Sequence, residues 1–147
     1  GVTPQDVEDI YQIRGMIEGL AARWAAEKIT DEQLKELKEV LDLMEFYTEK
    51  GNVEKLSELD SRFHDIIFKA SKSRPLESVL TNFHHFIQRA RLVSVKASGR
   101  AKYSLQEHRR IYEALEARDP EAAEKAVIDH IGSARTNLSP YLEKHEV

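Results

Sequence analysis

Apolar residues recur along almost the whole chain at the spacing of helical turns, and no stretch alternates with the period of two that a strand requires. Glycine and proline lie almost entirely between these periodic segments. A chain with this pattern buries its apolar stripes by packing helix against helix. We therefore expect an all-α fold, an antiparallel bundle of six helices with seven as the alternative, in which the 147 residues form one domain.

Capping residues and turns mark the ends of the expected helices. These helices span about residues 6–27, 30–50, 53–71, 75–90, 104–118 and 119–139. Thr30 begins the second, with Gln33 three residues on as a weak capping box. We expect residues 97–103 to be a loop, so that Ser104 caps the fifth helix and Glu107 completes its capping box.

The apolar stripes indicate which helix faces are buried. The expected stripe of the first helix is Ile10, Ile13, Ile17, Leu20 and Trp24. The second helix has Leu34, Leu37, Leu41 and Met44. The third has Leu56, Leu59, Phe63, Ile66 and Ala70. Each stripe follows the period of about 3.6 residues that directs side chains to one side of a helix.

Charge and composition exclude several functions. Charged residues make up 33% of the chain with both signs mixed, and the net charge of −4 argues against this chain itself holding a nucleic acid backbone. The absence of cysteine excludes disulfides and thiolate metal sites, and it fits a cytoplasmic protein. No segment resembles a membrane span or a signal peptide. Because the chain starts with Gly1 and a helix follows almost at once, we expect a piece of a longer protein whose missing part is N-terminal.

Four residues on three of the expected helices form a candidate ligand set for a metal ion: Asp60, His64, His108 and His130. Asp60 and His64 are four residues apart, so they share one helix face beside its apolar stripe. His108 and His130 each lie within the apolar face of their own helix. Three imidazoles and a carboxylate that converge in a helical bundle are ligands for a divalent transition metal.

A tight turn at Asp119 joins the last two helices, which should then run antiparallel. His108 precedes this residue by 11 positions, and His130 follows it by 11. At 1.5 Å per residue both histidines lie roughly 16 Å from the turn, at the same height. The spacing therefore predicts two facing imidazoles, with Asp60 and His64 as the other half of the site. The alternative is that each histidine is a hydrogen-bonded core residue, and spacing alone leaves this alternative open.

Two further residues are candidates for contact with a ligand. Arg14 lies at the edge of the buried face of the first helix, where a guanidinium could clamp an anionic ligand. A pair with Glu18, four residues on, explains the same position equally well. His84 mirrors His64 across the turn at residues 73–74, so it could approach the same site.

Several short patterns occur together in a fixed order. They are Ile13-Arg14-x-x-Ile17-Glu18-x-x-Ala21, Asp60-x-x-Phe63-His64, Glu107-His108-x-x-Ile111, and Ala122 with Ala126 leading to His130-Ile131. On these patterns the chain, over about residues 7–138, resembles the C-terminal ligand-binding domain, known as the FCD domain, of GntR-family transcription regulators of the FadR subfamily. The order of the patterns is much more specific than any one spacing.

The resemblance implies a function and a ligand set. In metal-containing members of the family an aspartate and three histidines bind the ion, and the matching residues here are Asp60, His64, His108 and His130. Residues 1–147 would form a single effector-binding and dimerisation domain, with a small carboxylate as effector and the homodimer as its assembly. An N-terminal winged helix-turn-helix domain, absent from this sequence, would read DNA.

Zinc or nickel is the expected ion, with manganese or iron as alternatives. We expect no enzyme activity, because no separate acid–base residue has an obvious place beside the four ligands. Two other functions remain open on the sequence. One is a helical-bundle metalloenzyme with an open site of three histidines and an aspartate, and the other is a metal-free structural dimerisation module.

Overall fold

The computed structural model of the chain describes residues 3–96 and 99–144, with the backbone alone described at residues 90–95 and 138–144. These residues contain helices and no strand, which confirms the expected all-α class. The helices are α1 (Pro4–Lys28), α2 (Asp31–Lys50), α3 (Val53–Ala70), α4 (Arg74–Asn82), α5 (His84–Lys96), α6 (Arg100–Glu116) and α7 (Pro120–Lys144). The described residues therefore form a bundle of seven helices, which is the expected alternative to a bundle of six.

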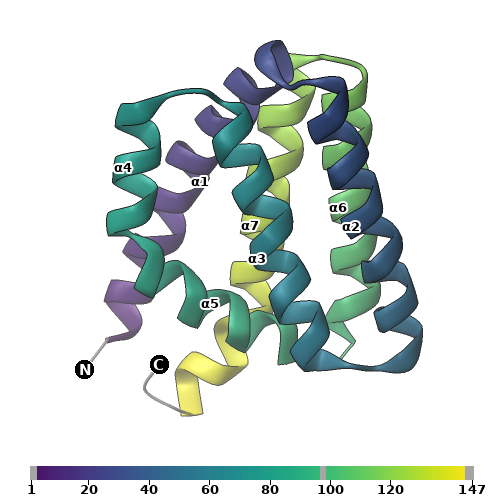
Figure 1. Ribbon diagram of the computed structural model, residues 1–147. Coiled ribbons are helices and arrows are strands. Elements are labelled where there is room, and N and C mark those ends of the chain that lie inside the picture. Colours follow the sequence, from purple (N-terminus) through teal and green to yellow (C-terminus); the bar gives the residue numbers. More distant parts are fainter. Residues whose placement is uncertain (1–2, 97–98, 145–147) are drawn as a thin grey trace.

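The long helices α1 and α7 pack along each other, and α6 also packs against α7 (Figure 1). Helix α3 contacts both α1 and α2, and α2 contacts α6, so these five helices enclose a common core. The shorter α4 and α5 lie to one side, with α5 crossing the lower end of the bundle in Figure 1. In the part of the chain that the structure describes, no helix is both long enough and apolar enough to cross a bilayer.

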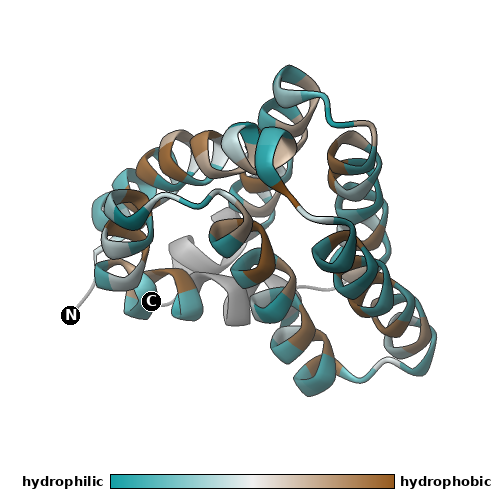
Figure 2. Cartoon of the chain, turned by 45° about the horizontal axis from the view of Figure 1, so that its top comes forward, coloured by the Kyte–Doolittle hydropathy of each residue, from teal (hydrophilic) through white to brown (hydrophobic). Residues whose placement is uncertain are grey.

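Apolar segments face the interior of the bundle, as the brown parts of the helices in Figure 2 show. The stripe of α3 is buried over its whole length, as expected. In α2 the stripe is also buried, except that Leu34 is only partly covered. Each large aliphatic side chain removed from water in this way contributes about 1.5–3 kcal/mol. These two stripes cover the sides on which α2 and α3 pack together.

The buried face of α1 differs from the expected stripe. Ile10 is buried, but Ile13 is 39% exposed, and the other members of the stripe are only partly covered. Half of the buried residues of this helix are small: Gly19, Ala21, Ala22, Ala25 and Ala26. Because large apolar residues occur on more than one side of α1, periodicity alone did not define its buried face. The small residues let α1 approach its neighbours closely.

The cap of α2 confirms the expectation from the sequence. Thr30 Oγ1 accepts a hydrogen bond from the backbone of Gln33, whose side chain accepts one from the backbone of Thr30. At the other end Gly51 adopts the left-handed conformation, with a φ of 68°, which glycine reaches without a Cβ penalty. These caps end α2 close to the predicted positions.

Two helix boundaries differ from the prediction. The expected fourth helix is divided at Phe83 into α4 and α5. Helix α6 begins at Arg100, after Gly99 with a φ of 74°, and therefore four residues before the expected start. Ser104 then lies inside α6, so its predicted capping box with Glu107 was wrong. Both of these side chains have partners at the candidate site instead.

Gly19 marks a close contact between α1 and α7. A Cβ at this position would lie 3.0 Å from Cγ1 of Ile128. We expect Gly19→Val to lower the free energy of unfolding by about 1–3 kcal/mol, because its methyl groups overpack this contact. Gly15→Ala on the same helix meets open space and should raise the free energy of unfolding by about 0.5–1 kcal/mol. Urea denaturation measures both values, and equal effects would contradict the close contact.

Candidate metal centre

Helix α3 carries Asp60 and His64 into the core. Their exposed fractions are only 6% and 1%, because both flank the buried stripe that contains Phe63. Asp60 Oδ1 lies 3.4 Å from His64 Nε2, so the spacing of four residues brings the two side chains together as predicted.

Helices α6 and α7 bring His108 and His130 face to face. The two rings are buried, and their centroids lie 4.5 Å apart. This contact confirms that both histidines stand at the same height in the hairpin, as their equal distance from Asp119 predicts. The hairpin completes a cluster whose rings also contact His64, with centroid distances of 5.5 Å from His108 and 5.4 Å from His130.

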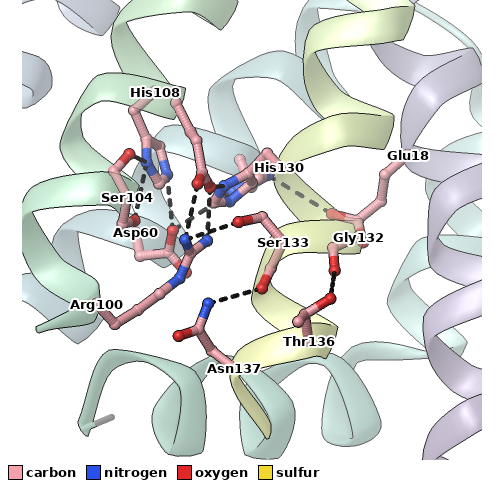
Figure 3. A network of polar contacts seen from close by, with 12 residues as sticks. Glu18, Asp60, Arg100, Ser104, His108, His130, Gly132, Ser133, Thr136 and Asn137 are labelled. Carbon is pink, nitrogen blue, oxygen red and sulfur yellow. Dashed lines mark hydrogen bonds and ion pairs between the residues drawn. The ribbon is translucent and has the colours of Figure 1, made fainter. Parts of the chain in front are cut away.

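The four predicted ligand residues converge on one point in the core (Figure 3). Each of Asp60, His64, His108 and His130 offers one donor atom, and all four atoms lie within 4.8 Å of one another. Donor atoms bound to one ion at about 2.1 Å lie no more than about 4.2 Å apart. The cluster therefore needs only a small contraction to enclose a metal ion.

The orientation of His108 supports this fit. Its Nδ1 lies 2.7 Å from the carbonyl oxygen of Ser104, which can only accept, so this nitrogen carries a proton and donates it. In a neutral imidazole the other nitrogen, Nε2, is then an acceptor, yet it faces Asp60 Oδ1 at 2.8 Å. Two acceptors at this distance require a second proton or a cation between them. The donor set fits a metal ion.

Outer acceptors hold the other two imidazoles in the same way. His130 Nδ1 donates to Glu107 Oε1 at 2.6 Å, and His64 Nδ1 lies 3.5 Å from Glu18 Oε1. All three rings thus direct Nδ1 outward to an oxygen, which leaves Nε2 for the centre. Such outer partners orient metal-binding histidines and raise their basicity.

The ionisation states suit metal binding as well. Burial and the neighbouring His108 together lower the pKa of His130 to about 3 against the opposing hydrogen bond to Glu107, so the ring is neutral. Burial alone would raise the pKa of Asp60, but the charge of His64 and the hydrogen bond from His108 hold it well below its usual range. Neutral imidazoles and ionised carboxylates are the forms that bind metals, so His130 and Asp60 have the required forms, and a bound ion would replace the His64 charge beside Asp60.

Glu107 connects His130 to a buried arginine that the sequence analysis did not identify. Arg100 Nη1 donates to Glu107 Oε2 at 2.7 Å, and Nη2 donates to Oε1 at 2.5 Å. Arg100 Nη1 also lies 3.2 Å from Ser133 Oγ. Burial would raise the pKa of Glu107, but its hydrogen bonds with His130 and Arg100 lower it to about 2. The result is an ionised, bidentate pair beside the cluster.

Helix α1 supplies a second buried pair. Arg14 Nε donates to Glu18 Oε2 at 2.6 Å. This is the ion pair between residues four positions apart that the sequence predicts as one of the two roles of Arg14. The guanidinium carbon of Arg14 also lies 5.0 Å from the centroid of the Tyr11 ring. Burial raises the pKa of this tyrosine to about 12, although the charge of Arg14 opposes the rise. Arg14 is thus fully inside the protein and keeps its charge.

A small pocket opens beside the cluster. Its walls are Arg14, Met44, Thr48, Leu56, Asp60, Arg100, Ala101, Ser104, Leu105, His130 and Ala134. The cavity volume is about 40 Å³, which is room for on the order of three water molecules. Two arginines and two of the candidate ligands therefore line one space. The pair of Arg14 with Glu18 is confirmed, and its contact with an anionic ligand stays a prediction.

The structure does not bring His84 into this site. Its side chain is exposed and lines a separate groove, together with Asp65, Lys69 and Glu77. The mirror relation to His64 assumed one straight helix after the turn, and the chain bends at Phe83 before His84 begins α5. His84 is therefore not a neighbour of the four candidate ligands.

The sequence patterns did not identify Glu18, Arg100 and Glu107 as members of the site. A signal exists for the last two, since they are seven residues apart and so share a helix face once α6 begins at Arg100. Glu18 lies 46 residues before His64, and only the packing of α1 against α3 brings them together.

The Arg100–Glu107 pair predicts a large stability effect. We expect Glu107→Ala to lower the free energy of unfolding by about 3–5 kcal/mol, because it leaves the buried guanidinium without its partner. Glu45→Ala removes the exposed pair with Arg109, where the side chains are 51% and 39% exposed, and should change the value by less than about 1 kcal/mol. Urea denaturation with a chelator present in every sample measures both. A small effect of Glu107→Ala would contradict the buried pair.

The sequence of the chain is similar to that of known proteins. The FCD domain family matches residues 9–133 of the chain. The chain is 29% identical over 144 residues to the HTH-type transcriptional regulator YdhC of Bacillus subtilis (strain 168), covering 97% of this chain and 64% of that protein. It is 28% identical over 137 residues to the galactonate operon transcriptional repressor of Escherichia coli (strain K12), covering 92% of this chain and 58% of the repressor. The chain thus spans less than two thirds of the length of these relatives.

Solved structures show the same arrangement of helices. Escherichia coli McbR/YncC superimposes with a TM-score of 0.85 at 21% identity, over 96% of this chain and 68% of that one. Streptococcus agalactiae GntR superimposes with a TM-score of 0.73 at 28% identity, over 88% of this chain and 58% of that one. The relatives are transcriptional regulators and not enzymes, in agreement with the expectation from the sequence. The chain belongs to the FCD domain family of GntR-type transcription regulators.

Proposed function

We propose that this chain is a metal-dependent, effector-sensing domain in which Asp60, His64, His108 and His130 hold a divalent transition metal ion. The observation that carries the proposal is the convergence of four buried donors, with an oxygen facing Nδ1 of every histidine. Zinc and nickel fit these ligands first, and manganese or iron is also compatible. A bound ion would act as a Lewis acid with open positions for a carboxylate oxygen.

The pocket favours a small carboxylate as the effector. Arg14 and Arg100 line the same walls as Asp60 and His130, so an anion that enters meets guanidinium groups beside the centre. Among the relatives, the Escherichia coli repressor is named for the galactonate operon, and galactonate is itself a carboxylate. We infer that Arg14 binds the effector carboxylate and neutralises part of its charge. His84 is not part of this proposed contact.

Helix α1 links this pocket to the DNA-binding domain that we propose precedes it in the whole regulator. Arg14 lines the pocket, and its partner Glu18 lies beside His64, so a change at Arg14 reaches α1 and the cluster together. The proposed assembly is a homodimer that binds DNA through winged helix-turn-helix domains. Effector binding alters operator affinity only if the effector distinguishes two states of that dimer.

Metal content tests the ligand assignment. We expect about one divalent ion per chain in the wild-type protein and at least a tenfold loss of affinity in His108→Ala and His130→Ala, because each variant removes one of four ligands. His84→Ala and His85→Ala are matched controls, since both side chains are exposed and should keep wild-type content. Elemental analysis and calorimetric metal titration measure these values. Equal content in all four variants would contradict the ligand assignment, and absence of metal from the wild-type protein would leave a metal-free dimerisation module as the better description.

A thermal-shift screen of small carboxylates, with and without chelator, tests the effector class. A ligand at about one hundred times its Kd should raise the Tm by roughly 5–10 °C in the metal-loaded protein. We expect Arg14→Lys, which retains a cation beside Glu18, to reduce this shift because lysine lacks the planar fork. Chelator should abolish the shift. A shift that survives chelation would contradict metal-dependent sensing, and turnover of the acid during incubation would indicate an enzyme instead.

A further inference from the structure

Arg100 has an unused donor at the pocket. The residue is 1% exposed, and its two terminal nitrogens are occupied by Glu107 and Ser133. Its Nε is buried and has no hydrogen-bond partner among the residues that the structure describes. A buried N–H group that remains without an acceptor is costly, so an unmatched donor beside a pocket indicates a missing partner. Arg100 also lines that pocket, together with Asp60 and His130.

The buried charges around the pocket restrict the charge of a ligand. The guanidinium groups of Arg14 and Arg100 carry two positive charges, while the carboxylates of Glu18, Asp60 and Glu107 carry three negative charges. Imidazoles that bind a metal ion are neutral, so the other groups sum to one negative charge, and a divalent ion changes the sum to one positive charge. A buried site with uncompensated charge is unfavourable. One additional negative charge therefore balances the site, whereas two would leave it negative again.

The terminal nitrogens of Arg100 already share the charge of Glu107 through a bidentate contact. Its Nε–H is therefore better suited to a neutral oxygen than to a second carboxylate. A hydroxyl or carbonyl group fits this need, because its oxygen accepts a hydrogen bond without adding charge. The small volume of the cavity allows such a compact group beside the carboxylate.

We propose that Arg100 determines effector specificity: its Nε–H donates to a neutral hydroxyl or carbonyl oxygen of a singly charged carboxylate. This role rests on the proposed function, since it assumes that a carboxylate enters the pocket of the metal-loaded protein. Arg14 holds the charged end of the effector, and Arg100 recognises the oxygen beside it. The pocket then rejects acids that lack this oxygen, and it rejects dicarboxylates because of their second charge.

Matched acids test this assignment on the metal-loaded protein. The probes are propionate, lactate and malonate, together with pentanoate, 2-hydroxypentanoate and glutarate, and calorimetry gives each Kd. We expect the hydroxy acid of at least one triad to bind about tenfold or more tightly than its two partners, the effect of one hydrogen bond to a charged donor. Equal binding of the hydroxy acid and the simple acid in both triads, or tightest binding of a dicarboxylate, would overturn the role of Arg100.

Arg100→Lys removes the Nε–H group but keeps a cation opposite Glu107. We expect the preference for the hydroxy acid, given as the ratio of the two Kd values in the fully metal-loaded variant, to fall below about threefold. Arg135→Lys alters a more exposed arginine–glutamate pair, with Glu8, away from the pocket and should keep the wild-type preference. An unchanged preference in Arg100→Lys would mean that Nε is satisfied by water alone, and loss of metal would assign Arg100 to holding His130. Either result overturns the proposal.

Different results would contradict the proposed carboxylate-sensing function and the proposed role of Arg100. If no acid of either triad binds in a metal-dependent manner, the proposed carboxylate-sensing function fails, and the assignment of Arg100 fails with it. If acids bind only to the metal-loaded protein but without preference for the hydroxyl group, the proposed function stands and only the assignment of Arg100 is wrong.

Discussion

Burial of ionisable groups at the centre of a small helical bundle is the constraint on which this structure depends. Eight arginine, carboxylate and histidine side chains are at most 9% exposed, and they come from α1, α3, α6 and α7. Each buried charge destabilises the fold unless a partner neutralises it or hydrogen-bonds to it. No one of these helices can therefore move by a turn along its neighbours without separating a pair. The apolar stripes supply most of the stabilisation, and the polar cluster selects the register.

Two chains of contacts of the same kind lead from the cluster to the pocket. On α1 the chain passes from an imidazole through Glu18 to Arg14, and on α6 it passes through Glu107 to Arg100. Both arginines line the pocket, so each connects a ligand-facing wall with the outer side of a candidate metal ligand. An effector that changes these walls would act on α1 and α6 at once. This arrangement provides a physical route for regulation in an FCD domain.

Local patterns predicted much of this fold. The stripes of α2 and α3 and the cap at Thr30 depend on residues within a few helical turns, and the structure confirms them. The stripe of α1 was wrong because its core contacts use small residues, which carry little periodic signal. The bend at Phe83 and the early start of α6 were also missed, since the packing of neighbouring helices overrides weak local preferences there. The displaced boundary concealed Arg100.

The sequence by itself determined which four side chains could meet. Asp60 and His64 share a helix face, and His108 and His130 share a height in one hairpin, so the proximity within each pair follows from helix geometry. The packing of α3 then brings the two pairs together. Only the tertiary structure decided which groups surround them: Glu18 beside His64, Arg14 and Arg100 on one pocket, and His84 away from it. These relations join residues on different helices, and their distances depend on how the helices pack, which no local pattern encodes.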